Sequence, residues 1–435
     1  MQYWKPDAAN EFAGDMMPFW DGARFHLFYL RDRDHHAEQG GLGGHQWAHA
    51  STGDLVHWQH HPLAVPIGVP GSVDQHGICT GSIFEHGGVY HAFYATRLKR
   101  PDGSVYESLC RAEGTDLVHF DKSAQNPLFG APPGLDPRNF RDPFVFQHPQ
   151  TGQFHLLVTA SRILEGGVEQ GVLAHYTSDD LDQWQYEGPF LEVSGHHAPE
   201  CPEHFFWNGW WYLLYSQGAQ LQYWISRDPL GPWQRAQCET IEGPNLAVPR
   251  TAAFHNGRRL AVGFLSWRRD SRDEGDYMYA GSAVFRELMQ DADGTLSTRF
   301  VSELLPRTGP PVDRPQLPVD AVITCRLVSE SEGSEYGLLL RADERGETGY
   351  RLCIDPREKQ VTLQAWPERG HFRAAILDSD GLNQPVDLVI CMKDSVIDVC
   401  LNERHTLVER CFDHRGTNLH SFAAEIENLT VAPIL

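Results

Sequence analysis

A glycine followed by a short apolar run recurs five times along this chain, at residues 21–30, 87–95, 151–160, 208–217 and 256–265. Each copy is typical of a tight turn that leads into a buried, aromatic-rich β-strand. The turn glycines of the five copies are Gly22, Gly88, Gly152, Gly209 and Gly257. Their spacing of roughly 50 to 65 residues is that of propeller blades, and β-propellers contain about four to eight blades. The repeat therefore predicts an all-β chain that begins with a five-bladed β-propeller.

A second phrase, Asp-Leu followed after two residues by an aromatic ring, lies between the glycine hairpins. It occurs at residues 53–58, 115–120 and 179–184, and in a looser form at 227–233. Its return between successive hairpins supports the same repeat.

The repeats end near residue 306, and the character of the sequence then changes. Residues 307–320 contain four prolines and no apolar periodicity, which is typical of a linker. Beyond the linker, strand-like runs separated by polar turns indicate a β-sandwich; they are 321–328, 336–342, 350–356, 360–366, 385–392 and 396–402. We therefore predict a propeller over residues 1–306, a linker over 307–320 and a sandwich over 321–435.

Charge and hydropathy exclude several classes of function. The formal net charge is −22, whereas binding to nucleic acid or to an anionic membrane requires a basic face. No apolar run reaches the roughly 18 residues of a membrane helix, and the N-terminus resembles no secretory leader. We therefore expect a cytoplasmic protein without nucleic-acid or membrane partners, and the sequence leaves its oligomeric state open.

Cysteine usage and short motifs indicate a chain without metal or cofactor. Nine cysteines are scattered without CxxC spacing, and buried free thiols in a reducing compartment explain such a pattern. The cluster RDRDHH at 31–36 has no further ligands at metal-binding spacing, so a polar loop is the simpler interpretation. Because no phosphate loop, nucleophile elbow or dinucleotide fingerprint is present, we expect neither a cofactor nor a metal.

Three carboxylates stand at comparable positions in the first, third and fourth repeats. Asp15, Asp142 and Glu200 precede their turn glycines by seven, ten and nine residues. In a propeller the strand before such a hairpin lines the central axis, so we expect these side chains to open into one axial pocket. A protonated acid beside an ionised carboxylate is what cleavage of a glycosidic bond requires. Taken singly, each acid is also explained as a turn former or a solvated surface group.

Arg-Asp-Pro at 141–143 and Glu-Cys-Pro at 200–202 resemble two of the three signature blocks of glycoside hydrolase family 32, which contains invertases, levanases and inulinases. Residues 44–58, 77–82, 285–288 and 293–304 are similar to further segments of this family. The resemblance spans most of residues 10–306, and the predicted sandwich agrees with the family's architecture.

The resemblance implies a role for each of the three acids. Asp15 would attack the anomeric carbon as the nucleophile, and Glu200 would act first as general acid and then as general base. Asp142 would stabilise the transition state by binding sugar hydroxyls. Arg141 would hydrogen-bond with this cluster of acids and balance its charge. The residues expected to bind the sugar are Arg141, Trp47 and Thr80, together with Trp267 as an aromatic stacking face. Trp47 in particular would offer an apolar face to a furanose ring.

The first signature block departs from the family's usual Asn-Asp-Pro-Asn-Gly and here reads Gly14-Asp15-Met16-Met17-Pro18. The implied nucleophile is kept, whereas two sugar-binding asparagines are lost. We predict a retaining glycosidase that cleaves a β-fructofuranosidic bond in sucrose-like sugars or short fructans, with nucleophile and acid roughly 5–5.5 Å apart. The alternatives are an inverting furanosidase or xylosidase like those of family 43, a non-catalytic carbohydrate-binding propeller, and a glycosyl transferase.

Overall fold

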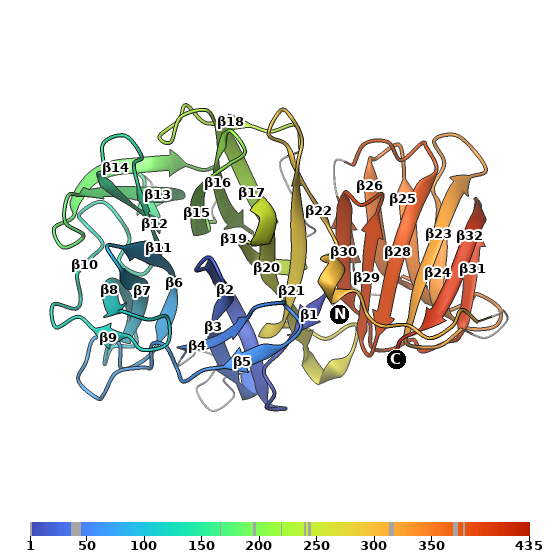
Figure 1. Ribbon diagram of the computed structural model, residues 1–435, viewed down its shortest axis with the longest axis horizontal. Helices are drawn as coiled ribbons and strands as arrows, with labels where there is room; N and C mark the ends of the chain where they lie inside the picture. The colour runs from blue at the N-terminus through green and yellow to red at the C-terminus, as the bar shows by residue number, and fades with distance from the viewer. Residues whose placement is uncertain are drawn as a thin grey trace. The chain divides into compact units, whose positions relative to one another are not determined.

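The computed structural model in Figure 1 describes residues 2–35, 45–165, 167–194, 197–218, 220–238, 241, 245–312, 317–368, 373–376 and 379–435. The regular structure of these residues consists of β-strands and short 3-10 turns, with no α-helix, in agreement with the all-β prediction. The chain divides into two compact units. The first comprises Lys5–Ala236 and Val248–Phe264, and the second comprises Met1–Trp4, Gln237–Ala247 and Leu265–Leu435.

The first unit contains antiparallel sheets whose strands follow one another along the chain. One sheet pairs β2 (Glu11–Trp20), β3 (Phe25–Arg33), β4 (Gln46–Thr52) and β5 (Trp58–His60) in that order. The next has the order β10-β8-β7-β6 with β9 on β8, and consists of β6 (Ile78–His86), β7 (Val89–Lys99), β8 (Val105–Gly114), β9 (Asp121–Lys122) and β10 (Phe129–Gly130).

Two further sheets of this unit have four strands each, again in chain order. They consist of β11 (Phe140–Gln147), β12 (Phe154–Ile163), β13 (Glu169–Ser178) and β14 (Gln185–Glu192), and of β15 (Glu200–Trp207), β16 (Trp210–Gln217), β17 (Gln220–Ser226) and β18 (Gln234–Arg235). The neighbouring strands β19 (Leu246–Ala253) and β20 (Arg259–Arg268) are joined through a 3-10 turn at His255–Gly257. In Figure 1 the strands β2, β6, β11, β15 and β19 lie toward the middle of this unit.

The five predicted glycine hairpins are confirmed. They join β2 to β3, β6 to β7, β11 to β12, β15 to β16 and β19 to β20. All five turn glycines have positive φ, between 73° and 97°. Glycine adopts this left-handed conformation without the steric penalty that a Cβ brings, which is why the turn repeats with this residue.

The Asp-Leu phrase forms the turn between the third and fourth strands of three sheets. In the first copy, Asp54 Oδ1 accepts hydrogen bonds from two backbone N–H groups two and three residues later, and Trp58 Nε1 donates to the Leu55 carbonyl at 2.9 Å. Asp180 and Trp184 repeat both features. Backbone hydrogen bonds lower the pKa of Asp180, as expected for a carboxylate held in its ionised form. The acids of this phrase are therefore structural.

Buried histidines occupy the interior of the sheets in the first unit. His155 Nδ1 lies 2.8 Å from His175 Nε2, and the pair His26 and His49 has the same arrangement at 2.9 Å. One ring of each pair must donate and the other accept, which two neutral imidazoles can do. Burial lowers the pKa of His155 and of His175 to about 4, and that of His204 to about 3.

We expect this unit to lose stability in mild acid. The folded pKa of these histidines lies below the unfolded value of about 6.5, so the unfolded chain binds protons first as the pH falls. Stability is then complete above about pH 6.5, and each fully buried histidine removes about 2 kcal/mol by pH 5. Differential scanning calorimetry at pH 7, 6 and 5 should show a melting temperature that falls by roughly 10 °C in total. A flat profile over this range, or an unchanged profile in His204→Gln, would contradict the assignment.

The second unit contains a β-sandwich preceded by a few further strands and turns. β21 (Tyr277–Gln290) pairs with β1 (Tyr3–Trp4) and with β22 (Leu296–Arg299), and 3-10 turns lie at Arg269–Ser271 and Ser302–Leu304. One sheet has the order β30-β29-β28-β23-β32, formed by β23 (Ala321–Ser329), β28 (Val386–Lys393), β29 (Val396–Leu401), β30 (His405–Arg410) and β32 (Ala424–Pro433). The other has the order β27-β26-β25-β24-β31, formed by β24 (Tyr336–Ala342), β25 (Gly349–Asp355), β26 (Gln360–Trp366), β27 (Arg373–Ile376) and β31 (Asn418–Phe422).

Alternate residues of the two sheets form one hydrophobic core, which includes Ile323, Leu338, Leu352 and Ile390 at 0% exposure. The predicted linker, residues 307–320, is tied to this sandwich where it is described. Val312 N donates to the Val431 carbonyl and Leu317 N to the Thr417 carbonyl, both at 2.8 Å. Residues 313–316 of the segment lie outside the described residues.

All nine cysteines are free thiols, and eight of them are buried while Cys238 is half-buried. The predicted buried free thiols are therefore confirmed. Among the residues described above, no helix has the length and apolar character needed to cross a membrane.

Candidate active site

The first strands of four sheets share an irregularity at the same place. Pairing with the next strand skips two residues in β2, β6, β11 and β15, between Ala13 and Met16, Ile78 and Gly81, Arg141 and Phe144, and Glu200 and Glu203. The extra residues of such a β-bulge leave the hydrogen-bond ladder and turn their side chains in a new direction, which is common beside active sites. Since no ladder N–H is needed there, the bulges of β11 and β15 tolerate Pro143 and Pro202.

The three predicted acids lie at these bulges, at three successive positions. Asp15 is the second bulge residue of β2, Asp142 is the first bulge residue of β11, and Glu200 immediately precedes the bulge of β15. Thr80 occupies in β6 the position that Asp15 has in β2. The offsets of Asp15 and Glu200 from their turn glycines therefore differ because the two acids take different positions within one repeated irregularity. Asp142 lies further from its glycine because the stretch between the bulge and the turn is longer in β11.

Asp142 joins the bulges of two sheets. Its side chain is 2% exposed, and its Oδ2 accepts hydrogen bonds from Thr159 Oγ1 at 3.1 Å and from Cys201 N at 3.0 Å. The backbone at Asp142 and at Cys201 has positive φ, 54° and 51°. This conformation is strained for residues with a Cβ, and such strain gathers at functional sites where the surroundings enforce it.

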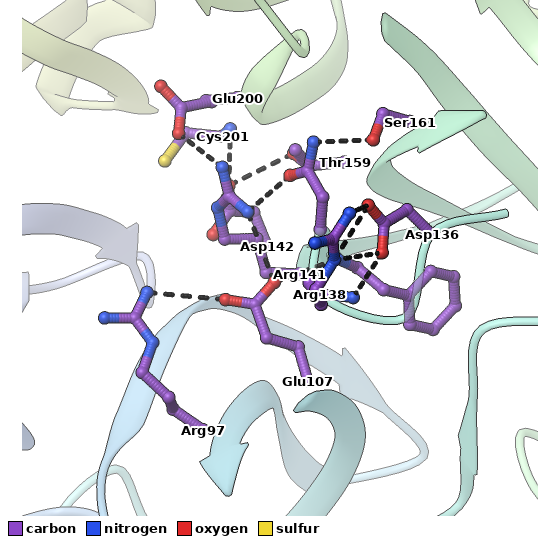
Figure 2. Close-up of polar contacts among 12 residues, drawn as sticks. Arg97, Glu107, Asp136, Arg138, Arg141, Asp142, Thr159, Ser161, Glu200 and Cys201 are labelled. Atoms are coloured by element: carbon purple, nitrogen blue, oxygen red, sulfur yellow. Dashed lines mark hydrogen bonds and ion pairs between the residues drawn. The ribbon is translucent and has the colours of Figure 1, made fainter. Parts of the chain in front are cut away.

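Arg141 connects Glu200, Asp142 and Glu107, as Figure 2 shows. Its guanidinium donates to Glu200 Oε1 at 2.7 Å and to Glu107 Oε2 at 3.2 Å, and its Nε lies 3.8 Å from Asp142 Oδ2. Burial by itself lowers the pKa of this guanidinium, but the charges of the three carboxylates outweigh burial and hold the pKa well above its usual value. Glu200 stays 40% exposed, so its carboxylate is held in place while remaining accessible.

Asp15 accepts a hydrogen bond from the neighbouring sheet that contains β6. Thr80, which is 1% exposed, donates from Oγ1 to Asp15 Oδ2 at 2.5 Å. The pKa of the buried Cys201 thiol is raised well above its usual value, first by burial and then by the charges of Asp142, Asp15 and Glu200. One thiol thus lies within electrostatic range of all three acids.

The structure buries Trp47, which was predicted to offer an open face to the sugar. Its side chain is 0% exposed, so its ring presents no open face on which a furanose could stack. Its Nε1 instead donates to the Cys79 carbonyl at 2.9 Å, and this bond fixes the bulge that carries Thr80. Packing against Phe28 and Tyr94 explains the burial.

Trp267 belongs to the second compact unit. The Arg410 guanidinium lies 4.2 Å from its ring centre, and Phe412 makes an edge contact with the ring at 5.5 Å. Its predicted contact with sugar stays a prediction.

The segment RDRDHH at 31–36 is also partly described, and its first three residues form the end of β3 instead of the predicted polar loop. Asp32 and His35 form an ion pair at 3.2 Å, whereas His36 lies outside the described residues. In the part of the chain that the structure covers, no three or more His, Cys, Asp or Glu side chains are grouped to hold a metal.

Two residues that the sequence analysis missed support the bulges. Glu107 is 3% exposed and accepts from Arg141, from Arg97 at 3.3 Å and from the Phe140 backbone at 2.9 Å. Arg250 of β19 is equally buried; it donates to the Gly81 carbonyl and, at 2.7 Å, to the Pro202 carbonyl. The sequence signal for Arg250 is a charged side chain inside a largely apolar strand, whereas β8 contains other charged residues and gives no signal for Glu107.

We expect Arg250→Met to lower kcat by about 100-fold, because two bulges that position the acids lose a shared support. Two buried carbonyls also lose their donor, at a cost of about 1–3 kcal/mol each. Steady-state kinetics and thermal melts should show both effects, with partial recovery in Arg250→Lys. Arg235→Met, which removes an exposed guanidinium 4.2 Å from the Trp224 ring, is the matched control and should leave kcat unchanged. A normal kcat in Arg250→Met would rule out the positioning role.

Comparison with known proteins agrees with this geometry. Residues 15–295 match the family described as glycosyl hydrolases family 32 N-terminal domain. The sucrose-6-phosphate hydrolase of Escherichia coli is 26% identical over 381 residues, which cover 79% of this chain and 74% of that protein. A probable sucrose-6-phosphate hydrolase of Psychromonas ingrahamii is 30% identical over 420 residues, covering 88% of this chain and 72% of that protein.

The crystal structure of fructan 1-exohydrolase IIa from Cichorium intybus has a similar fold, with a TM-score of 0.74 at 14% identity. That match covers 99% of this chain and 96% of the other. The family match extends over most of the chain and includes all three acids. The chain therefore belongs to glycosyl hydrolase family 32 and is a glycosidase of the β-fructofuranosidase type.

Proposed function

We propose that this enzyme hydrolyses β-fructofuranosidic bonds with retention of configuration, using Asp15, Glu200 and Asp142. The observation that carries the proposal is the cluster at the bulges, where Arg141 holds Glu200 beside buried Asp142 and where Asp15 shares the same electrostatic neighbourhood. Relatives named as sucrose-6-phosphate hydrolases support sucrose-like sugars as substrates, and the fructan 1-exohydrolase of similar fold supports short fructans.

The roles follow from double displacement. The Asp15 carboxylate attacks the anomeric carbon while Glu200 gives its proton to the glycosidic oxygen, so the C–O bond breaks and the leaving sugar departs as an alcohol. Glu200 then takes a proton from water, whose oxygen displaces Asp15 from the same carbon and restores its carboxylate. Two displacements give net retention. Both hydrogen bonds to Asp142 end at Oδ2, and we assign its Oδ1 to a sugar hydroxyl.

The altered first block bears on specificity. Met16 and Met17, which follow the proposed nucleophile, are 0% and 2% exposed and pack into the protein interior. They therefore add no polar group to the sugar site. We infer that hydroxyl recognition depends more on Asp142 and Arg141 than it does in relatives with the usual block.

We also propose that the first unit is a five-bladed propeller whose blades close into a ring, within the predicted limits 1–306, with the sandwich over 321–435. Contacts between successive hairpins support closure, since they run from each blade to the next and from the last to the first. They are Phe19–Tyr90, Phe84–Phe154, Phe146–His204, Trp207 Nε1 to the Gly257 carbonyl, and Phe254–Trp20. The nine free cysteines support the predicted cytoplasmic location.

The test is to incubate the pure enzyme with sucrose, inulin and an arabinofuranoside while following early products by ¹H and ¹³C NMR. Release of β-fructofuranose before mutarotation is the expected result. Early appearance of the α-anomer would show inversion, and cleavage of only the arabinofuranoside would move the substrate to another pentofuranose. A crystal structure with a bound fructoside should place Asp15 and Glu200 roughly 5–5.5 Å apart.

A further inference from the structure

A hollow lies on the sandwich, at the sheet formed by β24, β25, β26, β27 and β31. Its volume is about 410 Å³, within the range of small-molecule sites. Its lining includes Arg345, Arg351, Trp366, His420, Ser421 and Phe422. The hydrolysis proposed above makes no use of this pocket.

Strand pairing explains why these side chains share one face. Arg351 and His420 both lie opposite Leu339 on neighbouring strands, so the three residues form a row across the sheet. Their chain neighbours Leu338 and Leu352 belong to the sandwich core. Because side chains alternate along a strand, the row lies on the face turned away from that core.

A glycine makes room for one of the aromatic rings on this face. Phe422 lies opposite Gly337, and Trp366 lies opposite Gly349. A Cβ at Gly337 would come within 3.1 Å of the Phe422 ring, so the ring lies directly over the bare backbone. Phe422 therefore lies low on the sheet, and together with Trp366 it forms the apolar part of the hollow.

The polar groups of the hollow are held in place by contacts of their own. The Arg351 guanidinium lies 4.3 Å from the Phe422 ring centre and 5.1 Å from that of Trp366, and its Nη2 is 3.1 Å from Glu335 Oε2. His420 Nε2 lies 3.1 Å from the Asp343 carbonyl, which accepts its hydrogen bond. Stacking and ion pairing of this kind hold hydrogen-bond donors in a fixed orientation.

The balance of charges around the hollow indicates which kind of ligand it can bind. Arg351 is paired with Glu335, and Arg345 lies 4.0 Å from Glu347, so two cations are matched by two carboxylates. With no excess positive charge, the hollow has little electrostatic attraction for a phosphate or a carboxylate. The hollow combines aromatic surface with guanidinium, imidazole and hydroxyl groups. This combination suits a sugar ring, which has apolar C–H faces and many hydroxyl groups.

We propose that this hollow is a second carbohydrate site, separate from the acids, that binds a neutral saccharide chain. The choice of fructan as that saccharide rests on the proposed function. Binding a polymer at a second point raises its effective concentration at the active site, so the gain should appear with long substrates and be absent with sucrose.

The test measures binding of inulin and levan by affinity electrophoresis and calorimetry, using the full chain with Glu200→Gln to prevent hydrolysis. We expect Trp366→Ala and Arg351→Ala to weaken polymer binding by about tenfold. In the active enzyme the same changes should raise KM for inulin while kcat/KM for sucrose stays within about twofold. Sucrose turnover thus reports on the proposed function, and polymer binding reports on the second site.

Arg326→Ala is the matched control, since it removes an arginine from an exposed ion pair with Asp387 on the other sheet. Arg345→Ala, whose side chain is 82% exposed, keeps the test valid if a variant at Trp366 does not fold. Polymer binding that is unchanged in the Trp366, Arg351 and Arg345 variants would overturn the proposal. Competition of inorganic phosphate with inulin at the hollow would overturn it in favour of an anion site.

Discussion

Replacing Asp15 by alanine is expected to abolish hydrolysis of both sucrose and an aryl β-fructofuranoside, with a loss in kcat of at least about 10⁴-fold. Without this carboxylate no covalent intermediate forms, and the ease with which the leaving group departs does not compensate. Asp15→Asn should behave in the same way, because it keeps the shape of the side chain that Thr80 contacts but lacks the nucleophilic charge. Initial rates on both substrates provide the measurement.

The matched control for Asp15 is Asp102→Ala. Asp102 also accepts a hydrogen bond from a hydroxyl, that of Ser104 at 2.6 Å, but in an exposed turn. It should retain wild-type rates, and circular dichroism should show that all three variants are folded. Near wild-type activity in folded Asp15→Ala would mean that another residue is the nucleophile.

Replacing Glu200 by alanine should produce a loss that depends on the leaving group. A sugar alkoxide needs protonation as it departs, so kcat/KM for sucrose should fall by about 10²–10⁴-fold. An aryl leaving group needs little help, so kcat/KM for the aryl fructoside should fall by less than about tenfold. Steady-state kinetics on the two substrates, with azide added to replace the missing base in the second step, separate these effects.

Glu192→Ala tests whether the effect is specific to Glu200. Glu192 is 43% exposed and pairs with Arg162 at 2.7 Å, which closely matches the exposure of Glu200 and its distance from Arg141. It should leave both substrates unaffected. Equal losses on sucrose and on the aryl fructoside in Glu200→Ala would show that the residue holds the site together instead of transferring a proton.

The sequence alone determined the features that depend on near neighbours along the chain. The glycine hairpins were predictable because each turn needs a residue that accepts positive φ. Six sandwich strands were placed to within a residue or two at their ends, because apolar alternation marks a strand wherever it lies. The strands at Arg373–Ile376, His405–Arg410, Asn418–Phe422 and Ala424–Pro433 were missed, since they are short or carry polar residues on much of their length.

Only the tertiary structure decided which groups meet. Asp15 and Thr80 are 65 residues apart and Arg141 and Glu200 are 59 apart, and each pair is joined by the packing of one sheet against the next. The same packing buries Trp47, which by residue type alone suits a sugar-stacking face. Turn and strand patterns come from local backbone preferences, whereas partners and burial depend on how distant strands pack together. The acids and Arg141 could therefore be found by motif, whereas Arg250 and the contacts by which Thr80 and Trp47 hold the bulges required the fold.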